Sequence, residues 1–85
     1  MPNYLLLSRS ITHAQQMSAA LERFGIRAPY FRAPMALTSR GCSYALRLDP
    51  SRFTDAMARL ADRGLQPTGV FYDRGDGQYT EISRY

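Results

Sequence analysis

Cys42 is the only cysteine in this chain of 85 residues, and its thiol is the side chain best suited to covalent chemistry. A cysteine reacts as the thiolate, which is its nucleophilic form. The polar and small residues Thr38–Gly41 precede it, which favours a loop that presents the thiol to solvent. The alternative is a buried, inert thiol, because cysteine is among the residue types most often found in protein interiors.

The residues that follow Cys42 alternate between apolar side chains and others. This alternation is typical of a half-buried strand, which we predict over Ser43–Asp49. The strand would anchor the loop that carries the thiol. Arg40 lies two positions before the cysteine, and a neighbouring cation stabilises a thiolate over a thiol. Arg40 can equally be an ordinary solvated loop residue.

Other patterns that carry chemistry are missing from the sequence. It has no paired carboxylates at catalytic spacing, no Ser-His-Asp set and no glycine-rich phosphate loop, since Gly75 and Gly77 fit a turn. The single histidine, His13, has no partner at metal-ligand spacing, and one cysteine cannot form an internal disulfide. We therefore expect no metal, no cofactor and no independent enzyme activity.

The net charge of +4 arises from eleven basic residues that are all arginine. This usage can reflect codon bias, or it can serve the recognition of carboxylates and other anions, which guanidinium groups bind in a bidentate manner. The arginines are scattered from Arg9 to Arg84 instead of forming one block. Their spread argues against a dedicated nucleic-acid patch.

The elements expected around the thiol begin with an apolar strand at Tyr4–Ser8. Apolar residues at spacings of three and four then predict a helix over Ile11–Phe24, which Ser10 or Thr12 can cap and which Gly25 ends. The remaining elements are a strand over Arg27–Arg32, a helix from Asp49-Pro50 to Gly64, a strand over Thr68–Asp73 and a short hairpin arm over Gln78–Ile82.

The order β-α-β-β-α-β predicts one α+β domain over residues 1–85, a ferredoxin-like sandwich with two helices on one face of a four-stranded antiparallel sheet. The first and third strands would be central. The second, which contains Pro29, would be an edge, as would the fourth. In this topology Cys42 would lie near the start of the first helix, beside Ser10, Thr12 and His13, where the helix dipole also favours a thiolate.

Several segments of the sequence resemble the small bacterial selenium/sulfur carrier-like proteins. The matching segments are Tyr4–Leu7, Ser10–Ala14, Phe24–Ile26, Pro34–Leu48, Gly69–Tyr72 and Gly77–Tyr79. The resemblance implies a persulfide or perselenide carried on Cys42, with Ser39 as a polar neighbour. The family tends to place glycine directly after the cysteine, whereas here Gly41 precedes it and Ser43 follows.

The site expected from the sequence and the resemblance together consists of Cys42 as the chalcogen-carrying thiolate, Arg40 as the anion stabiliser, and Ser39, Gly41 and His13 as neighbours. His13 can instead be a solvent-facing residue at the helix start. The resemblance also implies two partners, a sulfur or selenium donor enzyme and an acceptor protein. We expect a cytoplasmic location without a membrane span, because the longest apolar run, Tyr4–Leu7, is too short to cross a bilayer.

Two other functions are consistent with this fold. The sheet face without helices could present Tyr30, Tyr72 and Tyr4 to a second copy or another partner, which would make the protein an interaction or homodimerisation module. The third strand also has some likeness to an RNA-recognition module, which stacks bases on exposed aromatic side chains. Exposing Tyr44 for this purpose would bury Arg47, an unpaired charge, so we consider RNA binding the weaker alternative.

Overall fold

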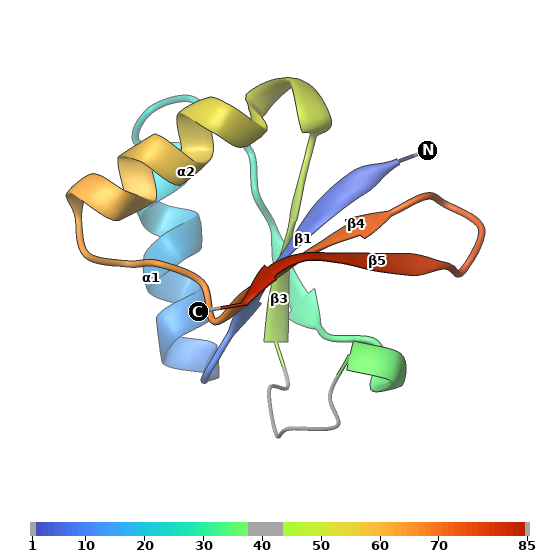
Figure 1. The fold of residues 1–85 in the computed structure, drawn as a ribbon. Coiled ribbons are helices and arrows are strands. Elements are labelled where there is room, and N and C mark those ends of the chain that lie inside the picture. Colours follow the sequence, from blue (N-terminus) through green and yellow to red (C-terminus); the bar gives the residue numbers. More distant parts are fainter. Residues whose placement is uncertain (1, 38–43, 85) are drawn as a thin grey trace.

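The computed structural model describes residues 2–37 and 44–84. They form an α+β fold in which two α-helices pack on one face of an antiparallel sheet of five strands. Figure 1 shows the second helix crossing the first, with the hairpin of the last two strands extending away from both.

The helices and strands follow one another in the expected order β-α-β-β-α-β through residue 73, and a further strand takes the place of the expected arm. The elements are β1 (Asn3–Ser8), α1 (Ile11–Glu22), β2 (Tyr30–Arg32), the 3-10 turn η1 (Met35–Leu37), β3 (Tyr44–Leu48), the 3-10 turn η2 (Pro50–Arg52), α2 (Phe53–Asp62), β4 (Gly69–Asp73) and β5 (Tyr79–Arg84).

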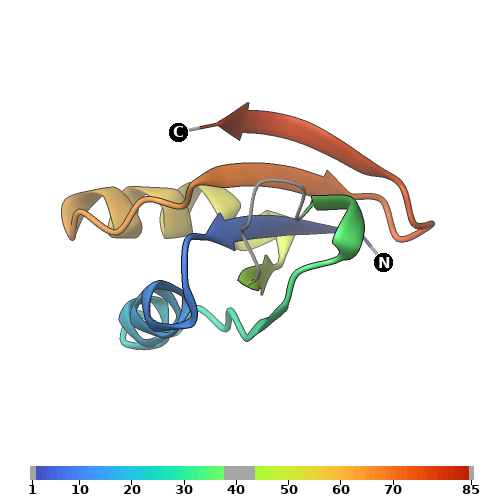
Figure 2. The same cartoon turned by 90° about the horizontal axis from the view of Figure 1, so that it is seen from below.

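The strand order is β2-β3-β1-β4-β5, and every neighbouring pair is antiparallel. β1 and β3 are interior and β2 is an edge, as expected. The prediction of a four-stranded sheet with β4 at its other edge was wrong, because the expected short arm is a full strand, β5, that pairs along β4. Figure 2 shows β5 at the outer side of the sheet.

A tight turn joins β4 to β5. The Asp76 carboxylate accepts a hydrogen bond from the backbone N–H of Gln78 at 3.0 Å, and Gly77 has a φ of 85°. Glycine adopts this left-handed conformation without the steric cost that other residues meet. The chain therefore turns tightly, and β5 pairs antiparallel with β4, with one register shift between Val70 and Phe71.

α1 begins after a side-chain cap and ends before a left-handed glycine. Ser10 caps α1, since its Oγ accepts from the backbone N–H of His13 at 3.1 Å, whereas Thr12 lies inside the helix. α1 ends at Glu22, two residues earlier than predicted. Gly25 has a φ of 72°, and the Ile26 N–H closes the end by donating to a carbonyl of the last turn.

The second helix, α2, begins at Phe53 without a side-chain cap of its own, because the predicted start at Asp49-Pro50 forms the 3-10 turn η2 that leads into it. Asp49 caps the turn η2, and its Oδ1 accepts from the backbone N–H of Ser51 at 2.8 Å. Pro50 occupies the first position of this turn, where a missing N–H costs nothing. At the other end, Gly64 has a φ of 66° and the Leu65 N–H donates to Leu60 at 2.9 Å.

The three tyrosines expected on the open face of the sheet lie on its helix side. Tyr4 stacks on Phe53 of α2 with ring centroids 4.0 Å apart, and Tyr72 meets Tyr4 edge to face. The hydroxyl of Tyr30 accepts a hydrogen bond from Gln15 of α1 at 3.1 Å. The predicted orientation of these three tyrosines was therefore wrong.

The opposite face of the sheet has its own smaller apolar cluster. Leu5, Leu7 and Ala45 are buried there against Ala33 and Leu37, which belong to the segment around η1. Phe31, Phe71 and Tyr79 are partly buried against the same cluster. This face is thus partly covered by the chain's own residues and is not a bare surface.

Candidate functional site

Four residues of the predicted site, Ser39, Arg40, Gly41 and Cys42, lie outside the described residues. The site is therefore described from the residues on either side of this segment. The last described residue before the segment is Leu37, which is buried in the apolar cluster on the sheet face opposite the helices. The first one after it is Tyr44, which opens β3.

Tyr44 is fixed to the end of β1 by the buried hydroxyl of Ser8. The two residues are opposite one another in the β1–β3 register. Ser8 Oγ lies 3.1 Å from the carbonyl oxygen of Tyr44 and 3.0 Å from that of Ser10, so one hydroxyl proton serves both acceptors. The start of β3 is therefore tied to the turn that leads into α1, close to the positive end of the helix dipole.

His13 is buried at this junction, with 4% of its surface exposed, which overturns the expectation of a solvent-facing residue. Its Nδ1 accepts a hydrogen bond from the backbone N–H of Arg9 at 3.4 Å, while Nε2 is buried without a hydrogen-bond partner among the described residues. Since Nδ1 acts as an acceptor, the ring is neutral and carries its proton on Nε2.

The surroundings of His13 lower its pKa below the ordinary value of 6.5. Burial is the main cause, because it disfavours the charged ring, and the positive charge of Arg9 adds to the effect. The backbone of Gln66 lies near the ring and opposes the shift in part, although it does not satisfy Nε2. A neutral His13 offers no positive charge to a thiolate, so its part here is to hold the β1–α1 turn.

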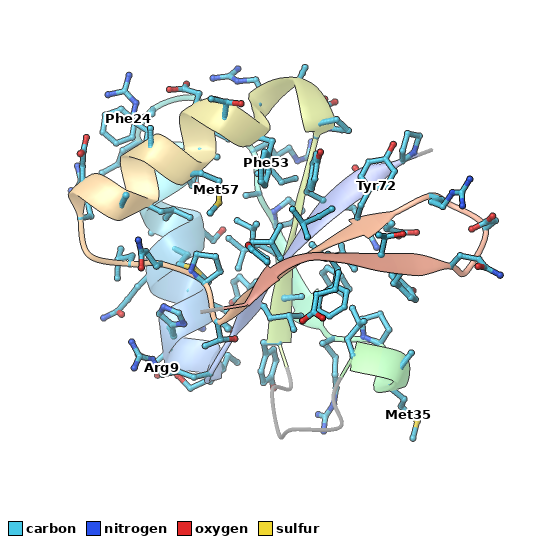
Figure 3. The ribbon with its side chains drawn as sticks, in the orientation of Figure 1. Arg9, Phe24, Met35, Phe53, Met57 and Tyr72 are labelled. Atoms are coloured by element: carbon cyan, nitrogen blue, oxygen red, sulfur yellow. The ribbon has the colours of Figure 1, made fainter. Side chains whose placement is uncertain are left out.

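Two arginines that the sequence analysis did not select lie at this end of the sheet. Arg9 directly follows β1, and Figure 3 shows it at the start of α1. Arg32 is opposite Tyr44 in the β2–β3 register. Both are exposed. Their positive charges favour an anion near the end of β1 and the start of β3. The sequence signal was a polar residue at each point where an apolar strand ends.

The described residues contain no group of three or more histidine, cysteine, aspartate or glutamate side chains that could hold a metal ion. Among the same residues, no helix is long and apolar enough to cross a bilayer.

Fold and site together define a small α+β protein whose one cysteine follows the 3-10 turn η1 in the sequence and precedes a central strand. Residues 3–72 match the protein family described as "Putative Se/S carrier protein-like". This match covers most of the chain and includes Cys42, and the protein therefore belongs to that family. Comparisons with curated proteins and with solved structures gave no match.

Proposed function

We propose that this protein is a sulfur or selenium carrier that holds the chalcogen on Cys42 as a persulfide or perselenide. The observation that carries the proposal is membership of the Se/S carrier-like family by a chain with a single cysteine, which lies inside the matched region. The protein is a carrier in this proposal and not an independent catalyst. Its donor is an enzyme that presents a cysteine persulfide or perselenide, and its acceptor is a second cytoplasmic protein.

The transfer step balances without an added oxidant. The Cys42 thiolate attacks the outer sulfur of the donor persulfide, a new S–S bond forms on Cys42, and the donor's own S–S bond breaks. The donor cysteine leaves as a thiolate. A perselenide transfers selenium in the same way, with a Se–S bond formed and another broken. Delivery to the acceptor repeats the step with Cys42 as the leaving group.

The framework beside the cysteine supports this chemistry. Ser8 fixes the carbonyl of Tyr44, which is two residues after Cys42 in the sequence. Arg9 and Arg32 place positive charge at the same end of the sheet, where α1 also begins. The two arginines and the start of α1 favour anions such as a thiolate or a persulfide. In the proposal Arg40, two positions before Cys42 in the sequence, adds a third cation.

RNA binding receives less support than the carrier function. Tyr44 packs against the helix-side core, together with the alternate β3 residues Leu46 and Leu48. The one tyrosine of this strand is thus not presented on the opposite face for base stacking. Arg47 lies on that opposite face, exposed, with its guanidinium 4.7 Å from the centre of the Phe31 ring.

We assign the first four strands and both helices to a ferredoxin-like unit to which β5 has been added. The support is the order β2-β3-β1-β4 of neighbouring antiparallel strands, together with the packing of both helices in one core. On this assignment β5 is an addition, and it lies beyond residue 72, where the family match ends.

The test is sulfur loading from a small-molecule donor, cysteine persulfide, followed by intact mass measurement and by transfer of the sulfur to cyanide. We expect the native protein to gain one sulfur atom and to release it as thiocyanate, and Cys42→Ser to do neither. Because any thiol can accept this sulfur, the loading rate of the folded protein is compared with that of the urea-unfolded chain. A folded rate no faster than the unfolded rate, or loading of the serine variant, would overturn the proposal.

A further inference from the structure

A groove lies beside the middle and the C-terminal end of α1. It has a volume of about 340 Å³ and is formed by the second half of α1 and the residues after α2. Its lining residues are Gln16, Ala19, Ala20, Arg23, Arg63 and Leu65. At about 1.5 Å per residue, the groove extends along the helix axis from about 9 Å (Gln16) to about 20 Å (Arg23) beyond the Ser10 cap.

The charge of the groove is positive and has no counterpart in its lining. Arg23 and Arg63 are both exposed, and neither makes an ion pair within residues 2–37 and 44–84. By contrast, Arg52 and Arg59 share the Asp55 carboxylate at 3.7 and 3.3 Å. The rim of the groove thus holds two guanidinium groups that the described part of the chain leaves without an anion.

The position of Arg63 is held by an aromatic ring. Its guanidinium lies 5.3 Å from the centre of the Phe24 ring, and that of Arg59 lies 4.3 Å from the same centre. Figure 3 shows Phe24 beside α2. Such cation–π contacts restrict a long side chain before any ligand arrives, which lowers the entropy lost on binding.

The shape and surroundings of the groove select among anions. Ala19 and Ala20 line it with methyl groups, which offer a small apolar surface in the same groove as the two arginines. Glu22 and Asp62, which adjoin Arg23 and Arg63 in the sequence, are exposed. A polyphosphate backbone carries a charge on every unit and would be repelled by these carboxylates, whereas a peptide with a few acidic residues need not approach them.

We propose that this groove docks an acidic segment of a partner protein, with aspartate or glutamate carboxylates on Arg23 and Arg63 and a small apolar side chain over the two alanines. Guanidinium groups bind carboxylates through paired hydrogen bonds, which gives the contact its geometry. The inference does not depend on the sulfur chemistry of Cys42.

The test uses the full chain, labelled with ¹⁵N, and an octapeptide of alternating glutamate and alanine with acetylated and amidated ends. Titration should shift the amide signals of residues 16–24 and 60–66 and leave the β4–β5 hairpin unchanged. The double variant R23Q/R63Q should weaken binding by about fivefold or more, because two charge-assisted contacts are lost. R74Q is the matched control, since Arg74 is an exposed arginine between β4 and β5.

Several results would overturn the proposal. One is equal weakening by R74Q, or shifts spread over all arginines, since either would indicate general attraction to a basic protein. Another is unchanged binding in R23Q/R63Q. Tighter binding of an oligothymidylate of equal charge at the same residues would assign the groove to nucleic acid. The spectrum of each variant reports its fold, and the single variants R23Q and R63Q give the same comparison if the double variant unfolds.

Discussion

The backbone N–H of Arg9 donates a hydrogen bond to Nδ1 of His13, and this contact fixes the buried imidazole in its neutral form. The donor belongs to the turn between β1 and α1, and the acceptor to the first turn of the helix. Protonation of Nδ1 would remove the acceptor and place a second positive charge beside Arg9. The junction that holds the start of β3 is therefore sensitive to acid.

The stability of the protein should fall as the pH drops through the ordinary histidine range. The pKa of His13 is lower in the folded protein than the 6.5 of an unfolded chain. The unfolded state thus binds a proton first, so the stabilisation present above about pH 6.5 is lost as the pH falls toward the folded-state pKa. Urea denaturation between pH 7.5 and pH 5 measures this slope.

The variant His13→Gln is the control for that measurement, since glutamine keeps an acceptor and does not titrate. It should show a flatter dependence of the unfolding free energy on pH in this range. An identical slope in the variant would mean that other groups account for the acid sensitivity.

The reactivity of Cys42 should report the positive charge around its segment. We expect the rate of alkylation by iodoacetamide to rise with an inflection well below the free-thiol pKa of about 8.5. Arg40→Ala and Arg9→Ala should each move the inflection upward, because a cation is lost near the thiolate. Arg74→Ala, which changes an exposed arginine between β4 and β5, should leave it in place. A rate near zero until the chain unfolds would show a buried thiol and contradict this prediction.

The glycines that end the two helices should be costly to replace. Gly25 and Gly64 have φ values of 72° and 66°, and a Cβ at either position would meet no atom within 4 Å, so the cost is conformational and not steric. Gly25→Ala and Gly64→Ala should each destabilise the protein by about 1 kcal/mol, or about 4–8 °C in Tm for a chain of this size.

Gly69→Ala is the matched control for these substitutions. Gly69 lies in β4 at an ordinary φ, and the nearest atom to an added Cβ is 3.5 Å away, which is normal van der Waals contact. Thermal unfolding should show a much smaller change for this variant. An equal loss at all three glycines would indicate that the left-handed conformation is not the cause.

The sequence predicted those features of the fold that depend on local chemistry. Asp49-Pro50, Gly25 and Gly64 mark helix boundaries because capping and left-handed glycines act within a few residues. Pro29 likewise indicated an edge strand, and β2 begins directly after it. These signals need no knowledge of the rest of the chain.

Features that depend on long-range packing were harder to predict. Leu5, Leu6 and Leu7 are all buried, so β1 is apolar on both faces and its pattern does not reveal which face the helices cover. The tyrosines on that side, such as Tyr4, were consequently assigned to the wrong face. The burial of His13 also depends on a tertiary contact, because the loop after α2 brings Gln66 near its ring.

The shortness of β2 has a consequence for self-association. This edge strand has only three residues, and Pro29 directly precedes it without an N–H to donate. Exposed edges are templates on which other chains assemble into aggregates, and short or proline-flanked edges are poor templates. The sheet is thus protected on its β2 side, and growth by strand addition is confined to the edge formed by the six residues of β5.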